Sequence, residues 1–545
     1  MKPILIVTGS MISPKEQSFR AAIQKQILSF RASSGAWLDI QTKIQTAEQL
    51  LRLRMGLKSR RMKKAPYRRT VEEFFSKKGN FETPELTEVT LATLLNIEGL
   101  PFRVCDFSTI CASKALRERL LDECPVLFIS STLLRDLSEL IPLLELLRRK
   151  GNRIIVGGAL TSMLHESWTR DDLVDVLAVG SGEALVPVLS NWLKGGALRA
   201  PAGGMMVEKG RTKVLFSGAP KSRNLDHYPR PNWKLAEKTH GRALPMVFYE
   251  SVRGCPYRCS FCNYPYLFDD RKFRHKSALK IADDWLHYAS HGVEYVTCLD
   301  SLFTMPKKRL LELCQILISE GSPLKWICYA RADDLSDVET CELMREAGCI
   351  QVQIGLESGS QQQLDNMNKK CTVAQNQQAL INCRRAGIVS VTTLILGFPG
   401  ETEASIKETF SLLKETPPDL YYAAAFNTRF EGVPILEQKE AERFGLKTLR
   451  GGHSSIPYWR HDTMTTAEIC AWQDWFTKKM AEERVALDGM LFFSGFLHYG
   501  FDQREDLLDF QRDIYLGRPI VKRVFKGLDR WAHRKLLADM ERVFT

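Results

Sequence analysis

Three cysteines in the segment SVRGCPYRCSFCNYP offer the clearest chemistry in this chain. Cys255, Cys259 and Cys262 follow one another in the spacing CxxxCxxC. A structural zinc site closes its shell with four ligands, usually two CxxC pairs or one pair with two later histidines, and no such partners stand nearby. An iron–sulfur cluster is held by cysteine thiolates and can leave one iron open. The spacing therefore favours a cluster with an open iron, with zinc as the minor alternative.

With Phe261 directly before Cys262, the segment resembles the CxxxCxΦC signature of the radical S-adenosylmethionine (SAM) enzymes. The resemblance implies that the three cysteines hold a 4Fe-4S cluster and that SAM chelates the fourth iron. An electron from an external donor of the flavodoxin or ferredoxin type then cleaves SAM to a 5'-deoxyadenosyl radical. The cofactor supplies the difficult chemistry, and the protein orients it and excludes water.

Further residues of that family's pattern follow the cysteines in order. The resemblance assigns Asp300 to the amino group of SAM, Arg331 to its carboxylate, and Glu357 with Ser358 to the ribose region. The turn LGFPGET adds cofactor-binding positions at Gly397, Pro399 and Glu401. Each also has a plain structural interpretation, as a buried ion pair, a strand-end cap or an ordinary turn. Tyr264 and Tyr266, just past the cysteines, are expected to be packing residues, and the sequence identifies no catalytic residue.

The elements before the cysteines predict an α/β domain. Short apolar runs at 4–9, 102–107, 125–132, 153–159 and 174–183 alternate with helix-length segments. That alternation predicts a doubly wound parallel sheet, which binds its ligand at the carboxyl ends of the strands. A dinucleotide site is disfavoured because GxGxxG is absent after the first strand.

This region resembles the cobalamin-binding domain that precedes many radical SAM domains. The resemblance implies cofactor contacts at three strand ends: Ser130, Ser131 and Thr132; Gly157 and Gly158; Gly180, Gly182 and Glu183. The DxHxxG motif that supplies a lower cobalt ligand is absent. The lower face of the cobalt would then be occupied by water, left open, or shielded by a side chain from the basic insertion at about 15–80.

The predicted organisation has four parts. A cobalamin-binding domain with the basic insertion covers 1–200, and a Pro-rich polar linker covers 201–243. A partial (β/α)6 barrel covers 244–436, because six strand-and-helix units follow residue 246 and the motifs fall at strand ends. A helical C-terminal domain covers 437–545.

Composition and charge bear on the compartment and the partners of the protein. We expect a cytoplasmic protein without a membrane span, because the N-terminus lacks a signal peptide and 14 mostly single cysteines suit a reducing compartment. The net charge of +12 is concentrated at 52–69, which holds nine Lys or Arg and no acid. That segment is either a patch for an anionic partner or a solvated helix face. Nucleic acid is disfavoured because aromatic side chains are scarce there.

Together the two resemblances imply a cobalamin-dependent radical SAM methyltransferase. Such an enzyme transfers a methyl group from methylcobalamin, recharged by SAM, to an unactivated carbon or phosphorus of a small-molecule or peptide substrate. One alternative is a cyclase or rearrangement enzyme that uses SAM only as a radical source. Others are a non-radical cobalamin and SAM methyltransferase, and a cluster-bearing sensor that binds nucleic acid. The substrate and the oligomeric state are not predicted.

Overall fold

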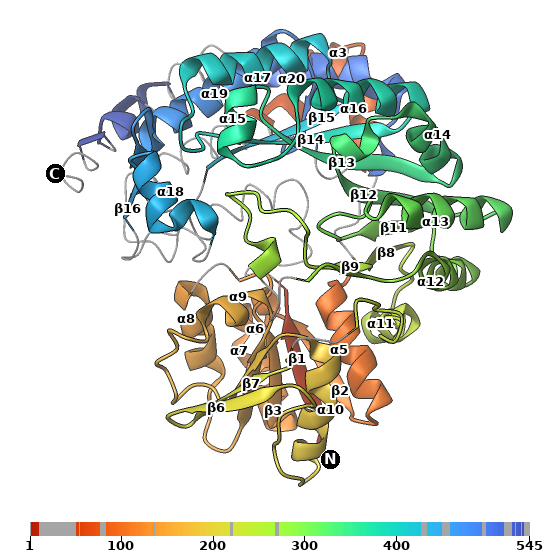
Figure 1. Ribbon diagram of the computed structural model, residues 1–545, viewed down its shortest axis with the longest axis vertical. Coiled ribbons are helices and arrows are strands. Elements are labelled where there is room, and N and C mark those ends of the chain that lie inside the picture. Colours follow the sequence, from red (N-terminus) through yellow and green to blue (C-terminus); the bar gives the residue numbers. More distant parts are fainter. Residues whose placement is uncertain are drawn as a thin grey trace.

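The computed structural model stacks two α/β units, with the N-terminal domain below the barrel in Figure 1. It describes residues 2–9, 51–53, 55–76, 83–134, 137–218, 222–266, 272–426, 433–449, 458–492, 497–516 and parts of 526–538. The first part of the predicted basic insertion and the end of the chain lie outside these ranges. Within them, no helix has the length and apolar character needed to cross a membrane.

The N-terminal domain is built on a seven-stranded sheet in the order β2-β1-β3-β4-β5-β7-β6. Its parallel core comprises β1 (Ile4–Thr8), β2 (Phe102–Asp106), β3 (Val126–Ser130), β4 (Arg153–Gly157) and β5 (Val176–Val179). β1 and β3 are buried along their whole length, since helices cover both faces of the sheet. The predicted doubly wound sheet is confirmed.

Separate apolar cores lie on the two faces of this sheet. One face is covered by α5 (Leu86–Ile97) and α10 (Gly182–Leu193). The other is covered by α6 (Phe107–Ala112), α7 (Lys114–Glu123), α8 (Leu137–Leu147) and α9 (Ala159–Leu164). α9 and α10 begin directly after β4 and β5, so their first residues lie at the carboxyl edge of the sheet.

The predicted linker at 201–243 needs correction. β6 (Met205–Lys209) and β7 (Thr212–Phe216) form a hairpin that extends the first sheet, with β7 parallel to β5. Val214 and Leu215 enter the two apolar cores, although the charged, Gly-rich sequence around them resembles a loop. After the hairpin, an extended segment leads to α11 (Trp233–His240).

The second unit is a partial barrel with strand order β19-β15-β14-β13-β12-β11-β8, all paired in parallel. The six predicted strands are β8 (Met246–Tyr249), β11 (Tyr295–Cys298), β12 (Lys325–Arg331), β13 (Cys349–Glu357), β14 (Val389–Leu396) and β15 (Leu420–Ala425). The outer helices are α12 (Ala278–Ser290), α13 (Lys307–Ser319), α14 (Val338–Glu346), α16 (Val373–Ala386) and α17 (Glu403–Glu415). The predicted (β/α)6 barrel is confirmed.

The described part of the basic insertion packs against the barrel. α3 (Arg60–Lys64) and α4 (Arg68–Ser76) lie beside α20 (Arg504–Leu516) in Figure 1. Met62, Val71 and Phe74 share an apolar core with residues at the amino ends of the barrel strands. Buried Arg52 donates to the carbonyl oxygens of Ile514 and Tyr515 at the end of α20. This segment therefore closes the end of the barrel that faces away from the strand-end motifs.

The C-terminal region is mixed rather than purely helical. Its helices are α18 (Gln438–Arg443), α19 (Thr466–Glu482) and α20. Between them, β16 (Lys447–Leu449), β17 (Tyr458–His461) and β18 (Met464–Thr465) form a small antiparallel sheet, and β19 (Leu487–Asp488) joins the barrel beside β15. These strands are only two to four residues long and carry too little periodicity to be predicted.

Candidate functional site: a cysteine loop beside an interdomain cavity

The cysteine loop leaves the carboxyl end of β8 and is fixed at several points. β9 (Val252–Arg253) pairs with β10 (Arg274–His275), and Gly254 then turns with φ +78°. A side chain at Gly254 would overlap the carbonyl oxygen of Lys272. The Ser260 amide donates to the Met367 carbonyl over 2.8 Å, which ties the loop to the segment after β13. Cys255, Cys259 and Cys262 are free thiols on this fixed loop.

Asp300 anchors the base of the loop. Its carboxylate accepts from the amides of Ser251 and Val252, over 2.6 and 2.8 Å, and from the Ser251 hydroxyl. Burial raises the pKa of Asp300 to about 6, against the effect of these hydrogen bonds. Its oxygens are therefore engaged by the protein backbone, which agrees with the plain structural interpretation of this residue.

Two buried cations lie beside the cysteines. Lys369 pairs with Glu357 over 2.8 Å, and Arg331 pairs with Asp333 over 2.9 Å while its guanidinium lies 3.7 Å from the Tyr257 ring centre. Arg331 also donates to the carbonyls of Lys369 and Lys370. The predicted carboxylate partner of SAM is thus already held by protein groups.

The thiols suit a cluster better than a single metal ion. Burial raises the pKa of the Cys259 thiol, while Lys369 and Arg331 act in the opposite direction and favour the thiolate. Among the described residues, no three His, Cys, Asp or Glu converge closely enough to hold one ion. A cluster does not require such convergence, because each thiolate binds a different iron. The residues present therefore fit a cluster.

The later motif residues form a buried framework around the loop. Phe261 meets Phe398 edge-to-face with centroids 6.4 Å apart. Ser358 lies 3.1 Å from the Thr409 hydroxyl, and Glu401 accepts from the Gly397 amide and the Ser405 hydroxyl. Burial raises the pKa of Glu401 to about 7. Pro399 is buried in the same turn.

A cavity of about 360 Å³ lies between the two units. The strand ends of the N-terminal domain supply one wall, with Ser130, Thr132, Gly157, Gly158, Gly180, Gly182 and Glu183. Deeper in the domain the cavity runs past apolar side chains of α5, β3 and α10. Glu250, Arg253, Tyr264 and Leu299 of the barrel supply the facing wall. The cavity thus lies between the predicted cofactor-binding strand ends and the cysteine loop.

One predicted residue turns away from the cavity. Ser131 is fully buried, and its hydroxyl donates to the Gly157 carbonyl over 2.8 Å and contacts the Thr161 hydroxyl. Its neighbours Ser130 and Thr132 do line the cavity. Gly158 has φ +105°, and a side chain there would approach the Thr132 amide within 2.7 Å. The strand ends are therefore shaped by backbone as much as by side chains.

Arg253 crosses between the units and was not predicted. Its guanidinium binds Glu183 with Nη2–Oε1 and Nη1–Oε2 distances of 2.7 and 2.9 Å. Although burial opposes ionisation, Arg253 lowers the pKa of Glu183 to about 2. The only sequence signal was the Arg-Gly pair before Cys255, because the partners lie 70 positions apart. Lys369, Tyr264 and Leu299 were likewise not assigned to a site.

Comparison with known proteins agrees with this geometry. Residues 249–413, from the end of β8 into α17, match the radical SAM superfamily model. The predictions of a radical SAM enzyme, with the 4Fe-4S cluster and SAM that the superfamily implies, are confirmed.

Relatives extend the likeness beyond the barrel. An anaerobic magnesium-protoporphyrin IX monomethyl ester cyclase of Cereibacter sphaeroides is 27% identical over 54% of this chain and 48% of its own length. An uncharacterized methyltransferase of Pyrococcus horikoshii is 27% identical over 52% of this chain and 62% of its own length. The chain thus matches about half to three-fifths of these two relatives.

A solved structure shares the fold over most of this chain. The radical SAM methyltransferase TsrM of Kitasatospora setae, with cobalamin and a [4Fe-4S] cluster bound, superposes with a TM-score of 0.61 at 16% identity. The match covers 81% of this chain and 98% of that one. At this identity the likeness shows a common fold, and it confirms the predicted pairing of an N-terminal parallel sheet with a radical SAM barrel.

Proposed function

We propose that this protein is a cobalamin-dependent radical SAM methyltransferase that acts on an unactivated carbon or phosphorus of a biosynthetic substrate. The observation that carries the proposal is the cavity whose two walls are the glycine-lined strand ends and the elements flanking the cysteine loop. A methyl donor and a radical source must face one enclosed space, because an inert C–H bond offers no lone pair for polar transfer.

On the barrel side, Cys255, Cys259 and Cys262 would hold the cluster, and the buried pairs Lys369–Glu357 and Arg331–Asp333 surround them. When bound, the cluster with SAM supplies a radical and cobalamin supplies a methyl group. The chain's own residues orient these groups and exclude water. Asp300 keeps the loop base in place, and Phe261 packs the loop against the GFPGET turn.

On the other side, the strand ends that line the cavity suit close contact with a large cofactor. Gly157, Gly158, Gly180 and Gly182 let the backbone approach it closely, and Ser130 and Thr132 supply hydroxyls. The deep apolar part lies between α5 and α10, next to the sheet. The described part of the basic insertion lies at the far end of the barrel, so residues 51–53 and 55–76 supply no lower cobalt ligand.

The substrate would enter the barrel from the cavity. Strand alternation points Phe248, Tyr329, Gln353, Thr393 and Tyr422 inward, because their neighbours on each strand belong to the core under the outer helices. All five are uncharged and partly exposed. We infer a substrate whose contacts with the barrel interior are aromatic or neutral and polar.

A cyclase is the second candidate, because a cyclase stands among the similar proteins. The two differ in the fate of SAM. The test is anaerobic: reconstituted protein is given cobalamin, SAM and reductant, and both SAM products are quantified by mass spectrometry. Radical methyl transfer predicts both S-adenosylhomocysteine, with methylated cobalamin, and 5'-deoxyadenosine. Production of 5'-deoxyadenosine alone would refute methyl transfer in favour of the cyclase, and S-adenosylhomocysteine alone would point to the non-radical enzyme.

A further inference from the structure

We propose that Arg253 is a positioning residue: its ion pair with Glu183 holds the cofactor cavity of the N-terminal domain in register with the cysteine loop. The inference rests on the proposed function, since it takes the cavity to be the cobalamin site. It also reassigns Glu183, which the sequence predicted as a cofactor contact, to a contact between the two units.

The geometry of the pair is specific. Two nitrogens of Arg253 bind the two oxygens of Glu183, and Nη1 also lies 2.9 Å from the Ser181 hydroxyl. The side chains are 15% and 10% exposed, so solvent screens the pair little. A planar guanidinium can span both oxygens of a carboxylate, whereas the single ammonium of lysine cannot.

The guanidinium of Arg253 has two further partners, a second carboxylate and an aromatic ring. Glu250, at the end of β8, accepts from Nε over 3.0 Å and from Nη2 over 2.8 Å. The Tyr228 ring, in the segment that joins the two units, lies 4.7 Å from the guanidinium carbon. Arg253 therefore contacts the N-terminal domain, the connecting segment and the barrel at once.

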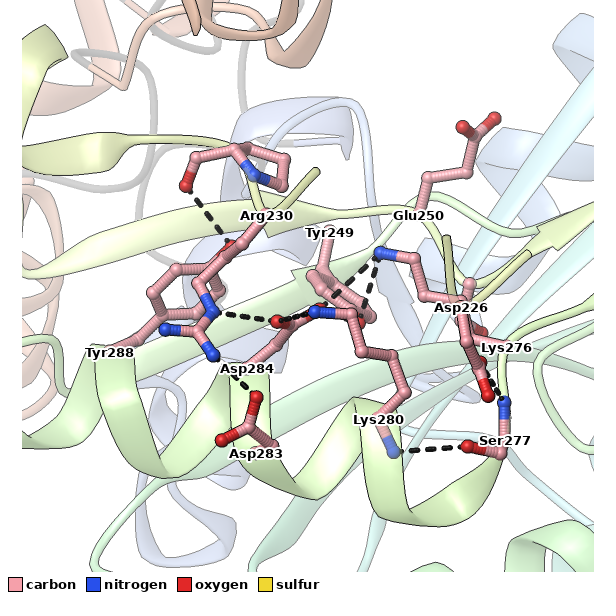
Figure 2. Close-up of polar contacts among 12 residues, drawn as sticks. Asp226, Arg230, Tyr249, Glu250, Lys276, Ser277, Lys280, Asp283, Asp284 and Tyr288 are labelled. Carbon is pink, nitrogen blue, oxygen red and sulfur yellow. Dashed lines mark hydrogen bonds and ion pairs between the residues drawn. The ribbon is translucent and has the colours of Figure 1, made fainter. Parts of the chain in front are cut away.

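The barrel side of this contact is held rigidly. Fully buried Asp284 accepts from Tyr249 over 2.7 Å, Arg230 over 2.6 Å and Lys280 over 2.8 Å, in the group of side chains drawn in Figure 2. Lys276 lies 3.1 Å from the Tyr249 hydroxyl in the same group. Arg230 belongs to the connecting segment and Tyr249 immediately precedes Glu250. The network thus fixes both the segment and the strand end that carry partners of Arg253.

The opposite side is equally constrained. Glu183 stands in the first turn of α10, and the Ser181 amide donates to the Ser217 hydroxyl over 3.0 Å. A side chain at Gly180 would overlap that same hydroxyl. Because Glu183 and Arg253 both line the cavity, and Arg253 is two residues from Cys255, a change in the pair shifts the cavity wall relative to the thiols.

A purely stabilising role is the rival explanation. Buried ion pairs often contribute little net stability compared with apolar residues of similar size, whereas catalysis responds strongly to displacements of about 1 Å. The two explanations differ in what a conservative substitution changes. Arg253→Lys keeps the charge and loses the two-point contact, and Glu183→Gln keeps the shape and loses the charge.

The experiment compares these two variants with Arg170→Lys. Arg170 also binds a carboxylate through two nitrogens, which lie 2.9 Å each from the oxygens of Asp172. This pair lies at the surface of the N-terminal domain, the domain that contains Glu183. Two readouts are used: the magnetic interaction between cob(II)alamin and the reduced cluster by EPR, and hydrogen exchange of peptides that cover 178–186 and 250–256 in the cofactor-free protein.

We expect both cavity variants to bind cobalamin below their melting temperatures but to give a broadened cluster-to-cobalt distance distribution. Glu183→Gln should also melt below the Arg170→Lys control, because it leaves the buried Arg253 guanidinium with one carboxylate fewer. Exchange in both peptides should be about tenfold faster than in wild type. A distance distribution like that of wild type, with cobalamin bound, would overturn the proposal, and so would unchanged exchange in both peptides. A loss of melting temperature with an unchanged distribution would identify the pair as merely stabilising.

The two readouts separate this inference from the proposed function. If wild-type protein binds no cobalamin, the proposed function fails. The exchange measurement still decides whether Arg253 and Glu183 hold the two units together.

Discussion

The two walls of the interdomain cavity are made in different ways. The barrel side depends on particular side chains: Glu250, Arg253 and Tyr264 line the cavity, and three thiols, an anchoring carboxylate and two buried cations lie on or beside the adjoining cysteine loop. The opposite wall depends on the absence of side chains, at Gly157, Gly158, Gly180 and Gly182. Side-chain ligands mark a sequence strongly, whereas a backbone surface marks it weakly. This difference explains why the residues of the barrel side are easier to recognise in the sequence than those of the opposite wall.

The largest expected effect breaks the side-chain wall. Cys259→Ala should abolish the cluster and all SAM cleavage, because two thiolates cannot retain it. Iron content and the cluster's visible absorbance provide the measurement. Cys111→Ser, at a half-buried free thiol of the N-terminal domain, is the matched control and should leave both unchanged. SAM cleavage retained by the alanine variant would refute the cluster assignment.

A bulky residue in the glycine-lined wall should block cobalamin binding and leave the cluster on the barrel side intact. Gly182 lines the cavity, and a Cβ atom added there would meet no atom within 4 Å, so the Cβ of Gly182→Phe has room beside the cavity. We expect cobalamin affinity to fall by about 100-fold, since the added ring occupies the cofactor's space. Gly182→Ala should bind almost as wild type does. Absorbance titration measures both, and equal affinities for the two variants would argue against this cavity as the site.

The framework behind the cysteine loop gives a pH-dependent effect. Because burial raises the pKa of Glu401 to about 7, above its ordinary value of 4.5, the protonated form suits the fold and the stabilisation is lost as pH rises through 7. The free energy of unfolding of Glu401→Gln, taken relative to that of wild type, should therefore increase by about 2–3 kcal/mol as the pH rises from 5 to 8. Denaturant unfolding at the two pH values checks this, and a constant difference would contradict it.

The smallest effect is expected far from both walls. Lys63 and Lys64 are exposed at the end of α3, which packs at the amino ends of the barrel strands. Replacing both with Glu should leave SAM cleavage within about twofold of wild type, because surface charges outside the site are screened. The rate of SAM turnover under reductant is the measurement. A large loss of SAM turnover would show that this basic segment contributes to the function of the site.

Local patterns predicted what depends on local spacing. The thiols were found because they stand within eight residues of one another, and the strand ends because apolar runs stop at Gly or Ser. The hairpin of β6 and β7 was missed because its charged residues mask β7, a strand paired on both sides between β5 and the edge strand β6. The Arg253–Glu183 pair could not be predicted at all, since its partners belong to different units and meet only in the folded chain.

The role of Asp300 shows a further limit. Its position at a strand end suited a cofactor contact, but its oxygens accept from the backbone amides of Ser251 and Val252. A sequence gives the end of a strand and not the direction in which a carboxylate turns. The same applies to Ser131, whose hydroxyl turns into the sheet while both its neighbours line the cavity.

The most direct test of the central claim is the metal content of the protein reconstituted anaerobically with iron, sulfide and cobalamin. Our account predicts about four iron and about one cobalt per chain, with the iron lost in Cys259→Ala and the cobalt lost in Gly182→Phe. Wild-type protein that retains iron but no cobalt would contradict the claim that one cavity serves both cofactors.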